Sequence, residues 1–174
     1  MRSRILFAIC IISFVGAQTP NLYINEFLAS SELCCTDEYG EVDDFIEIYN
    51  GDSDSVNIGG MYITDDLTQP TQWQIPETAP YSTTIEPGGF LLLWACNDSE
   101  QGVLHLEIKL SSGGEQIGLY AADGTTVIDT ITFGLQLEDT SYGRSPDGSA
   151  NWVYFSPPTP GTTNSVVTVY DGPV

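Results

Sequence analysis

Residues 43–51 read Asp-Asp-Phe-Ile-Glu-Ile-Tyr-Asn-Gly, and this stretch decides the fold class. Its centre, Phe45-Ile46-Glu47-Ile48-Tyr49, consists mostly of the β-branched and aromatic residues that favour strands. Asn50-Gly51 follows as a turn signal, and a second run of this kind begins at Val56, so the pair suits a hairpin. No stretch of the chain keeps a 3.6-residue apolar period. The sequence therefore predicts an all-β fold.

Similar short runs, separated by Gly, Pro, Asn and Asp, recur along the whole chain. Strands bounded by turns about every ten residues predict a sandwich of two sheets. Residues 90–94 are apolar throughout, which predicts a central strand buried on both faces. The proline-rich segment 65–88 is expected to be irregular and held in place by Trp73. The nine predicted strands cover residues 22–28, 45–49, 56–64, 90–95, 104–110, 116–120, 126–133, 141–143 and 151–155.

The first residues have the features of an export signal. Arg2 and Arg4 precede an apolar run of eleven residues, 5–15, and small residues follow up to Ala17. Eleven residues are too few to cross a bilayer, which takes about 20. We expect residues 1–17 to be a signal peptide and the mature chain to begin at Gln18, with no membrane span after cleavage. The predicted location is secreted or cell surface.

The mature part is strongly acidic. Lys109 and Arg144 are its only two basic residues against 24 acidic ones, so its formal charge is −22. Such a surface repels phosphate backbones, which argues against nucleic-acid binding. Aromatic residues make up 11% of the chain, which favours a packed fold over disorder.

Three cysteines remain after the predicted cleavage: Cys34, Cys35 and Cys96. An oxidising compartment favours a disulfide, and adjacent cysteines rarely bridge each other because the ring is strained. We therefore expect Cys96 to pair with Cys35, with Cys34 as the alternative partner. Three reduced thiols, or a link to another chain, remain open alternatives.

Several motifs in a fixed order resemble the lamin tail domain family, in its secreted bacterial-type form. The resemblance implies an immunoglobulin-like β-sandwich over residues 18–164, and the family supplies no catalytic residues to carry over. Residues 165–174 are then a linker or the start of a further module. The matching segments are 24–30 (INEFLAS), 43–50 (DDFIEIYN), 58–66 (IGGMYITDD), 85–91 (IEPGGFL), 142–148 (YGRSPDG) and 159–164 (TPGTTN).

Catalytic chemistry is poorly served by these residues. His105 is the one histidine, and no nucleophile-elbow pattern is present. A dyad of Cys35 with His105 is conceivable, but Cys35 is better used in a disulfide. A single imidazole also makes a weak zinc site. The sequence predicts a protein that is not an enzyme.

Acidic residues gather before and within the 45–49 run. Calcium takes six to eight oxygen ligands, many of them loop carboxylates, so this cluster is a candidate calcium site. The alternatives are a solvated acidic face, or a turn at Asp43-Asp44 that caps the following strand. The candidate ligands are Asp37, Glu38, Asp43, Asp44 and Glu47, with Glu41 in the same loop.

These observations predict a secreted, non-catalytic binding or structural module acting in adhesion, assembly or targeting. Its expected partner is an extracellular protein or polysaccharide. The alternatives are a calcium-dependent carbohydrate- or protein-binding domain and an accessory domain of an extracellular hydrolase. Asn97, in Asn97-Asp98-Ser99, is a glycosylation acceptor if the host glycosylates. Arg144 is expected to be a structural partner for a carboxylate.

Overall fold

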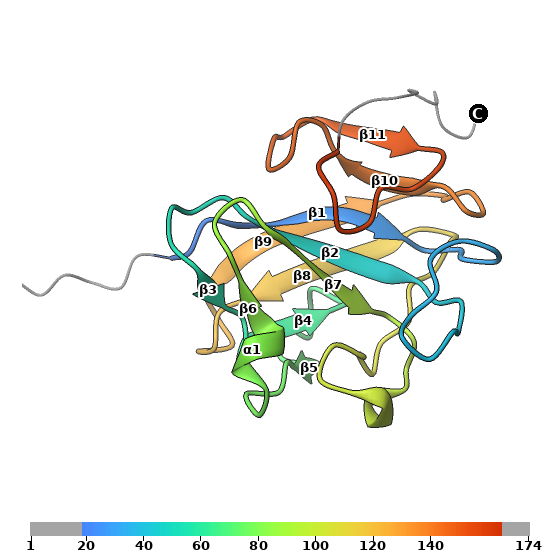
Figure 1. Ribbon diagram of the computed structural model, residues 1–174. Coiled ribbons are helices and arrows are strands. Elements are labelled where there is room, and N and C mark those ends of the chain that lie inside the picture. Colours follow the sequence, from blue (N-terminus) through green and yellow to red (C-terminus); the bar gives the residue numbers. More distant parts are fainter. Residues whose placement is uncertain (1–18, 165–174) are drawn as a thin grey trace, which may run out of the picture.

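The computed structural model describes residues 19–164, and these form an almost entirely antiparallel β structure (Figure 1). The predicted all-β, immunoglobulin-like sandwich is confirmed. The predicted signal peptide, residues 1–17, lies outside the described residues, as do Gln18 and the predicted linker at 165–174. The strands are β1 (Leu22–Leu28), β2 (Phe45–Asn50), β3 (Val56–Asn57), β4 (Tyr62–Thr64), β5 (Trp73–Gln74), β6 (Thr84–Ile85), β7 (Phe90–Trp94), β8 (Glu115–Tyr120), β9 (Val127–Phe133), β10 (Ser141–Arg144) and β11 (Trp152–Phe155), with two short helices, α1 (Pro80–Thr83) and η1 (Ser99–Gln101).

One sheet has five strands in the order β11-β10-β1-β2-β7. The stretch that predicted the fold, β2, pairs with β1 on one side and β7 on the other. The first strand of the chain thus lies in the middle of the sheet, between β2 and the late strand β10. This sheet joins the two ends of the described chain.

The second sheet has four strands in the order β5-β4-β8-β9, and a two-stranded sheet pairs β3 with β6. In Figure 1, β1, β2 and β7 lie in front of β8 and β9, which gives the two layers of the sandwich. Strand alternation explains the packing, because every second side chain points to the same face. Ile46 and Ile48 of β2 and Ile117 and Leu119 of β8 are fully buried in the shared core.

Phe27 is the centre of that core. Its ring centroid lies 4.4 Å from that of Phe133 on the facing sheet and 6.0 Å from that of Tyr142 on the neighbouring strand. It is fully buried. Aromatic pairs at this separation stabilise a core beyond their buried area.

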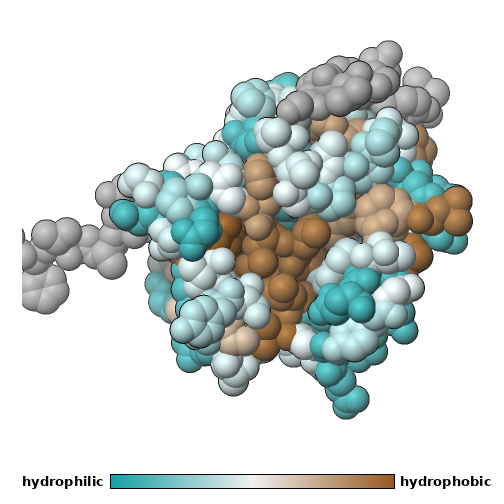
Figure 2. Space-filling view, in the orientation of Figure 1, coloured by the Kyte–Doolittle hydropathy of each residue, from teal (hydrophilic) through white to brown (hydrophobic). Residues whose placement is uncertain are grey.

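The expectation of a central position for β7 is wrong, because β7 is an edge strand of the five-stranded sheet. Its apolar character has another cause. Leu91 and Leu93 face the main core, whereas Leu92 and Trp94 pack on the other side against Leu28 and the cysteine loop. Part of β7 remains at the surface, and Figure 2 shows an apolar band across the middle of this face of the molecule.

Two other predicted strands differ from the structure. Residues 56–64 divide into β3 and β4, because a turn at Gly59-Gly60 with a positive φ of 86° at Gly60 interrupts them. Residues 104–110 form only isolated bridges, Trp94 to His105 and Cys96 to Lys109. In the latter segment, buried Leu106, Ile108 and Leu110 alternate with exposed Glu107 and Lys109, whereas His105 is buried as well. Its backbone bonds to the end of β7 and the loop after it only at Trp94 and Asn97, so it forms no continuous ladder.

Candidate functional site

The acidic loop before β2 is closed by a bridge between Thr36 and Val42. Asp37 organises its turn, because its Oδ1 accepts hydrogen bonds from the backbone N–H groups of Tyr39 at 2.8 Å and Glu41 at 2.9 Å. Gly40 supplies the positive φ of 82° that the turn requires. Figure 1 shows this loop beside the segment that follows β7. These contacts fix the conformation of the loop, and its carboxylates therefore have defined positions.

Three of its carboxylates converge. Asp37, Glu41 and Asp43 each place an oxygen within 4.8 Å of the other two. Within the described residues, Oδ2 of Asp37 and Oδ2 of Asp43 are buried and have no hydrogen-bond partner. Burial, followed by the charges of Asp37 and Glu41, raises the pKa of Asp43 above its ordinary value. The cluster is thus a concentration of negative charge with unsatisfied acceptors.

The structure does not bring all the predicted ligands to this cluster. Asp44 turns away, and its Oδ1 accepts a hydrogen bond from the backbone N–H of Ser31 at 2.9 Å. Burial raises the pKa of Asp44 to about 6. Glu47 lies within β2 and is fully buried in a different network, described below. Glu41 lies in the same loop and was not among the predicted ligands, but the structure brings it together with Asp37 and Asp43.

Glu38 contacts His105, which is fully buried at the end of β7. His105 Nε2 lies 3.3 Å from Oε1 of Glu38, and Nδ1 lies 3.4 Å from Sγ of Cys96. These two contacts suit a neutral imidazole that donates to Glu38 and accepts from the thiol. Burial raises the pKa of the Cys96 thiol, and the charges of Asp43 and Asp98 act in the same direction. The contact has the layout of a Cys–His pair, but its surroundings oppose the thiolate that catalysis would need.

The cysteine pairing differs from the expectation. Cys34 is joined to Cys35, and Cys96 is the free cysteine among the described residues. The structure thus gives no bridge from Cys96 to Cys35 or Cys34. All three sulphurs lie around the cluster of Leu28, Phe45 and Trp94, yet Cys96 contacts His105 instead. The loop is held elsewhere, because Oδ1 of Asp139 accepts the backbone N–H groups of Glu32, Leu33 and Cys34.

A buried pair of glutamates lies on the outer side of the five-stranded sheet. Glu26 of β1 and Glu47 of β2 are directly opposite each other, and neither is exposed to solvent. Oε2 of Glu26 accepts from Thr159 Oγ1 at 2.7 Å, and its Oε1 accepts from the backbone N–H of Thr159 at 2.8 Å and from the Ser141 hydroxyl. Oε2 of Glu47 accepts the backbone N–H of Gly161 at 2.6 Å. The segment 159–161 thus closes over both carboxyl groups.

Asn25, Asp147 and Asn164 complete this network. Nδ2 of Asn25 donates to Oε1 of Glu47 at 3.1 Å and to Oδ1 of Asp147 at 3.0 Å. Asn164 Nδ2 donates to the backbone oxygens of Asn25 and Arg144. Burial raises the pKa of Glu47 to about 8, and the charges of Glu26 and Asp147 add to the effect. The pKa of Glu26 is also raised, chiefly by burial.

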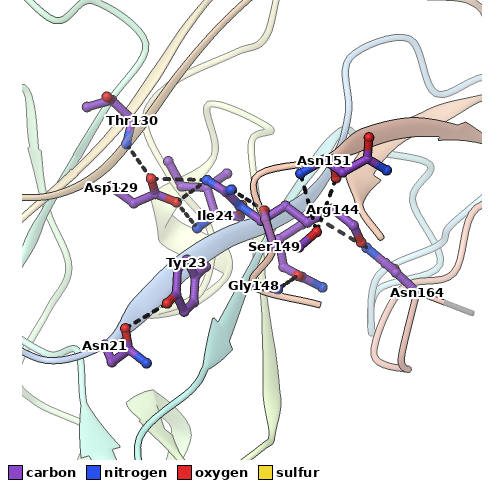
Figure 3. Close-up of polar contacts among 11 residues, drawn as sticks. Asn21, Tyr23, Ile24, Asp129, Thr130, Arg144, Gly148, Ser149, Asn151 and Asn164 are labelled. Atoms are coloured by element: carbon purple, nitrogen blue, oxygen red, sulfur yellow. Dashed lines mark hydrogen bonds and ion pairs between the residues drawn. The ribbon is translucent and has the colours of Figure 1, made fainter. Parts of the chain in front are cut away.

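Arg144 links β10 to both sheets, as Figure 3 shows. Its Nη2 donates to both carboxylate oxygens of Asp129, at 3.1 and 2.9 Å, and its Nε donates to the backbone oxygen of Ile24 at 2.9 Å. The guanidinium also lies 4.7 Å from the centre of the Trp152 ring. The expected role as a structural partner for a carboxylate is therefore what the structure shows.

Aromatic rings form a ladder on the β10–β11 hairpin. Tyr142 stacks on Trp152 with centroids 5.2 Å apart, and it lies 4.6 Å from the Tyr154 ring. All three side chains are half-buried. Within the described chain, β11 pairs only with β10, so the ladder stands beside a free sheet edge. The predicted role of the tryptophans in packing holds for Trp152, whose ring lies 6.0 Å from that of Phe27.

Asn97, the possible glycosylation acceptor, is exposed in the loop after β7. Its φ of 60° is one of the three positive values of non-glycine residues in the described part. An exposed turn leaves its side chain accessible.

The fold and these sites define a class: an immunoglobulin-like β-sandwich with buried polar networks that join its strands and loops. The Lamin Tail Domain family model matches residues 16–134. The chain belongs to the lamin tail domain family, whose members are generally non-catalytic structural or binding modules. The match ends before β10 and β11, which complete the five-stranded sheet. A search of curated proteins and a search of solved structures each found no match.

The Glu26–Glu47 network is the feature that sequence reasoning missed. Glu47 stands among apolar residues, and the sequence analysis took it for a candidate calcium ligand in the acidic cluster. Two of the motifs that resemble the family contain polar residues of this network, around Asn25-Glu26 and at Thr159–Gly161. These motifs are far apart in the sequence, and their polar residues meet only in the folded structure.

Proposed function

We propose that this chain is a secreted or cell-surface module that binds an extracellular protein or polysaccharide and catalyses no reaction. It would belong to the secreted, bacterial-type branch of its family. Export is supported by the order of basic, apolar and small residues in 1–17. No helix in the part of the chain that the structure describes is long and apolar enough to cross a membrane.

The aromatic ladder of Tyr142, Trp152 and Tyr154 carries this proposal. Half-buried aromatic rings can stack on sugar rings or pack against a protein, and they are enriched where proteins bind partners. Among residues 19–164, β11 pairs only with β10, so its other edge offers backbone groups for an extended partner segment. The strong negative charge supports a partner other than nucleic acid.

The ladder and the acidic loop are separate features. The ladder lies on β10 and β11 at one edge of the five-stranded sheet, whereas the acidic loop contacts the segment after β7, at the other edge. A calcium-dependent sugar site would need both in one place. The arrangement therefore favours a binding face that works without the acidic loop.

A binding assay with a matched pair of variants tests the proposal. The immobilised chain is assayed against a panel of purified polysaccharides and extracellular proteins. Tyr154→Ala should weaken the interaction by about tenfold, the effect of losing an interface anchor worth about 1.4 kcal/mol. Tyr81→Ala is the control, because Tyr81 is fully exposed on α1, away from the ladder. Equal binding by Tyr154→Ala and the unaltered chain would contradict the proposed face.

A further inference from the structure

We propose that Asp37, Glu41 and Asp43 form a site for a divalent cation that prefers oxygen ligands, with calcium as the ion. Each of these residues offers a carboxylate oxygen within 4.8 Å of the other two. Two oxygens bound to one calcium ion at 2.3–2.6 Å lie at most about 5 Å apart. The three carboxylates are therefore already spaced as ligands of one ion.

Two orphaned oxygens point to a missing positive charge. Asp37 is only 7% exposed, and within the described residues its Oδ2 accepts no hydrogen bond. Oδ2 of Asp43 is likewise buried and accepts no hydrogen bond within the described residues. A buried charged oxygen without a partner is costly, so native proteins pair such atoms with a donor or a cation. Oδ1 of Asp37 is satisfied by the turn, which fixes the side chain and leaves its second oxygen free.

The neighbouring donors argue for a hard cation over zinc. A second possible group of metal ligands consists of Asp37, Glu38 and His105, in which His105 would provide a nitrogen ligand. That nitrogen, Nε2, already contacts Glu38 at 3.3 Å, and Nδ1 contacts the Cys96 thiol. The unsatisfied atoms of Asp37 and Asp43 are both carboxylate oxygens, which calcium binds in sets of six to eight with carbonyls and waters. Magnesium holds its waters more tightly and fits such a cluster less well.

The site is open to solvent on one side. Glu41 is exposed, and a pocket of about 170 Å³, lined by Asp43, Cys96 and Lys109 among others, adjoins the cluster. Lys109 is exposed and forms no ion pair within the described residues, so no salt bridge to it occupies the oxygens of Asp37, Glu41 or Asp43. An ion can enter, keep some of its waters and order the loop, whether or not the domain binds an extracellular partner.

Calcium binding is measured on the purified chain by calorimetry and by thermal unfolding in CaCl2 or chelator at equal ionic strength. At a calcium concentration of 100 times the dissociation constant, the melting temperature should rise by roughly 5–10 °C. Terbium, a calcium substitute, should luminesce when tyrosine is excited, because Tyr39 lies in the same turn.

Asp37→Asn is the decisive variant. It keeps the Oδ1 acceptor that builds the turn and replaces the orphaned oxygen with an amide, so the loop should fold while calcium binding weakens by about tenfold or more. Glu41→Gln provides a second test at an exposed position. Asp54→Asn, in an exposed loop at the far end of β2, removes the same charge and should change nothing.

Three outcomes would overturn the assignment. One is an equal melting temperature in calcium and in chelator. Another is unchanged calcium affinity in both Asp37→Asn and Glu41→Gln. The last is binding of zinc but not calcium, abolished by His105→Gln, which would place the ion at the imidazole. A failure of partner binding with intact calcium binding would bear only on the proposed function.

Discussion

Replacing Glu47 with glutamine should change how the stability of the sandwich depends on pH. Glu47 has a pKa of about 8 in the folded protein against 4.5 without the fold, because burial disfavours its charge. The folded state therefore binds a proton that the unfolded chain has already released. As far as Glu47 determines it, the free energy of unfolding is highest below about pH 4.5 and falls as the pH rises toward about 8.

The size of this loss follows from the two pKa values. Each pKa unit corresponds to about 1.36 kcal/mol, so the free energy of unfolding should fall by about 3 kcal/mol between pH 5 and pH 8. Burial raises the pKa of Asp44 to about 6, and this adds to the decline in the lower part of that range. The Glu47→Gln variant loses one acceptor, because Asn25 and Gly161 both donate to the carboxylate. That loss costs about 1 kcal/mol at all pH values.

The variant should therefore be less stable than the unaltered chain at pH 5 and more stable at pH 8. Urea unfolding followed by tryptophan fluorescence, at constant ionic strength and with chelator present, measures both curves. Glu100→Gln is the matched control, because Glu100 is exposed on η1 and should leave the pH dependence unchanged. Parallel curves for Glu47→Gln and the unaltered chain would refute the assignment of this pH dependence to Glu47.

Four further measurements test the fold and the processing of the chain. Phe27→Ala should lower the free energy of unfolding by about 3–5 kcal/mol, as measured in urea. Arg144→Lys should lower it by about 2–3 kcal/mol, since one ammonium group cannot reach Asp129 and the backbone oxygens of Ile24 and Ser149 at the same time. N-terminal sequencing of exported protein should begin at Gln18, and an intact Met1 would contradict cleavage. Alkylation under non-reducing conditions, followed by peptide mapping, should modify Cys96 alone among the described cysteines.

Local patterns predicted the strands and the fold class, because a strand's alternation is visible within a few residues. β1, β2, β8 and β9 all lie close to where their apolar alternation placed them. Sheet order was harder, since an apolar run such as Phe90–Trp94 looks the same whether another strand or a loop covers it. Only the three-dimensional structure shows that the cysteine loop covers its second face.

The candidate site was predicted in outline and corrected in detail. The loop carboxylates Asp37 and Asp43 do converge, but chain proximity does not determine which way a side chain turns. Asp44 binds the backbone of Ser31, and Glu47 belongs to β2, where alternation points it to the opposite side from Ile46. Of the two donors to Glu47, Asn25 belongs to the neighbouring strand β1, and Gly161 comes from the far end of the described chain. No local pattern contains that information.

The position of β1 has a consequence for how the protein is made. β1 is synthesised first, yet one of its partners, β10, and the segment that covers Glu26 are among the last described residues to be synthesised. A nascent chain therefore cannot complete its central sheet until almost the whole domain has been translated. Such distant pairing slows folding, because a long loop must close before its contacts form.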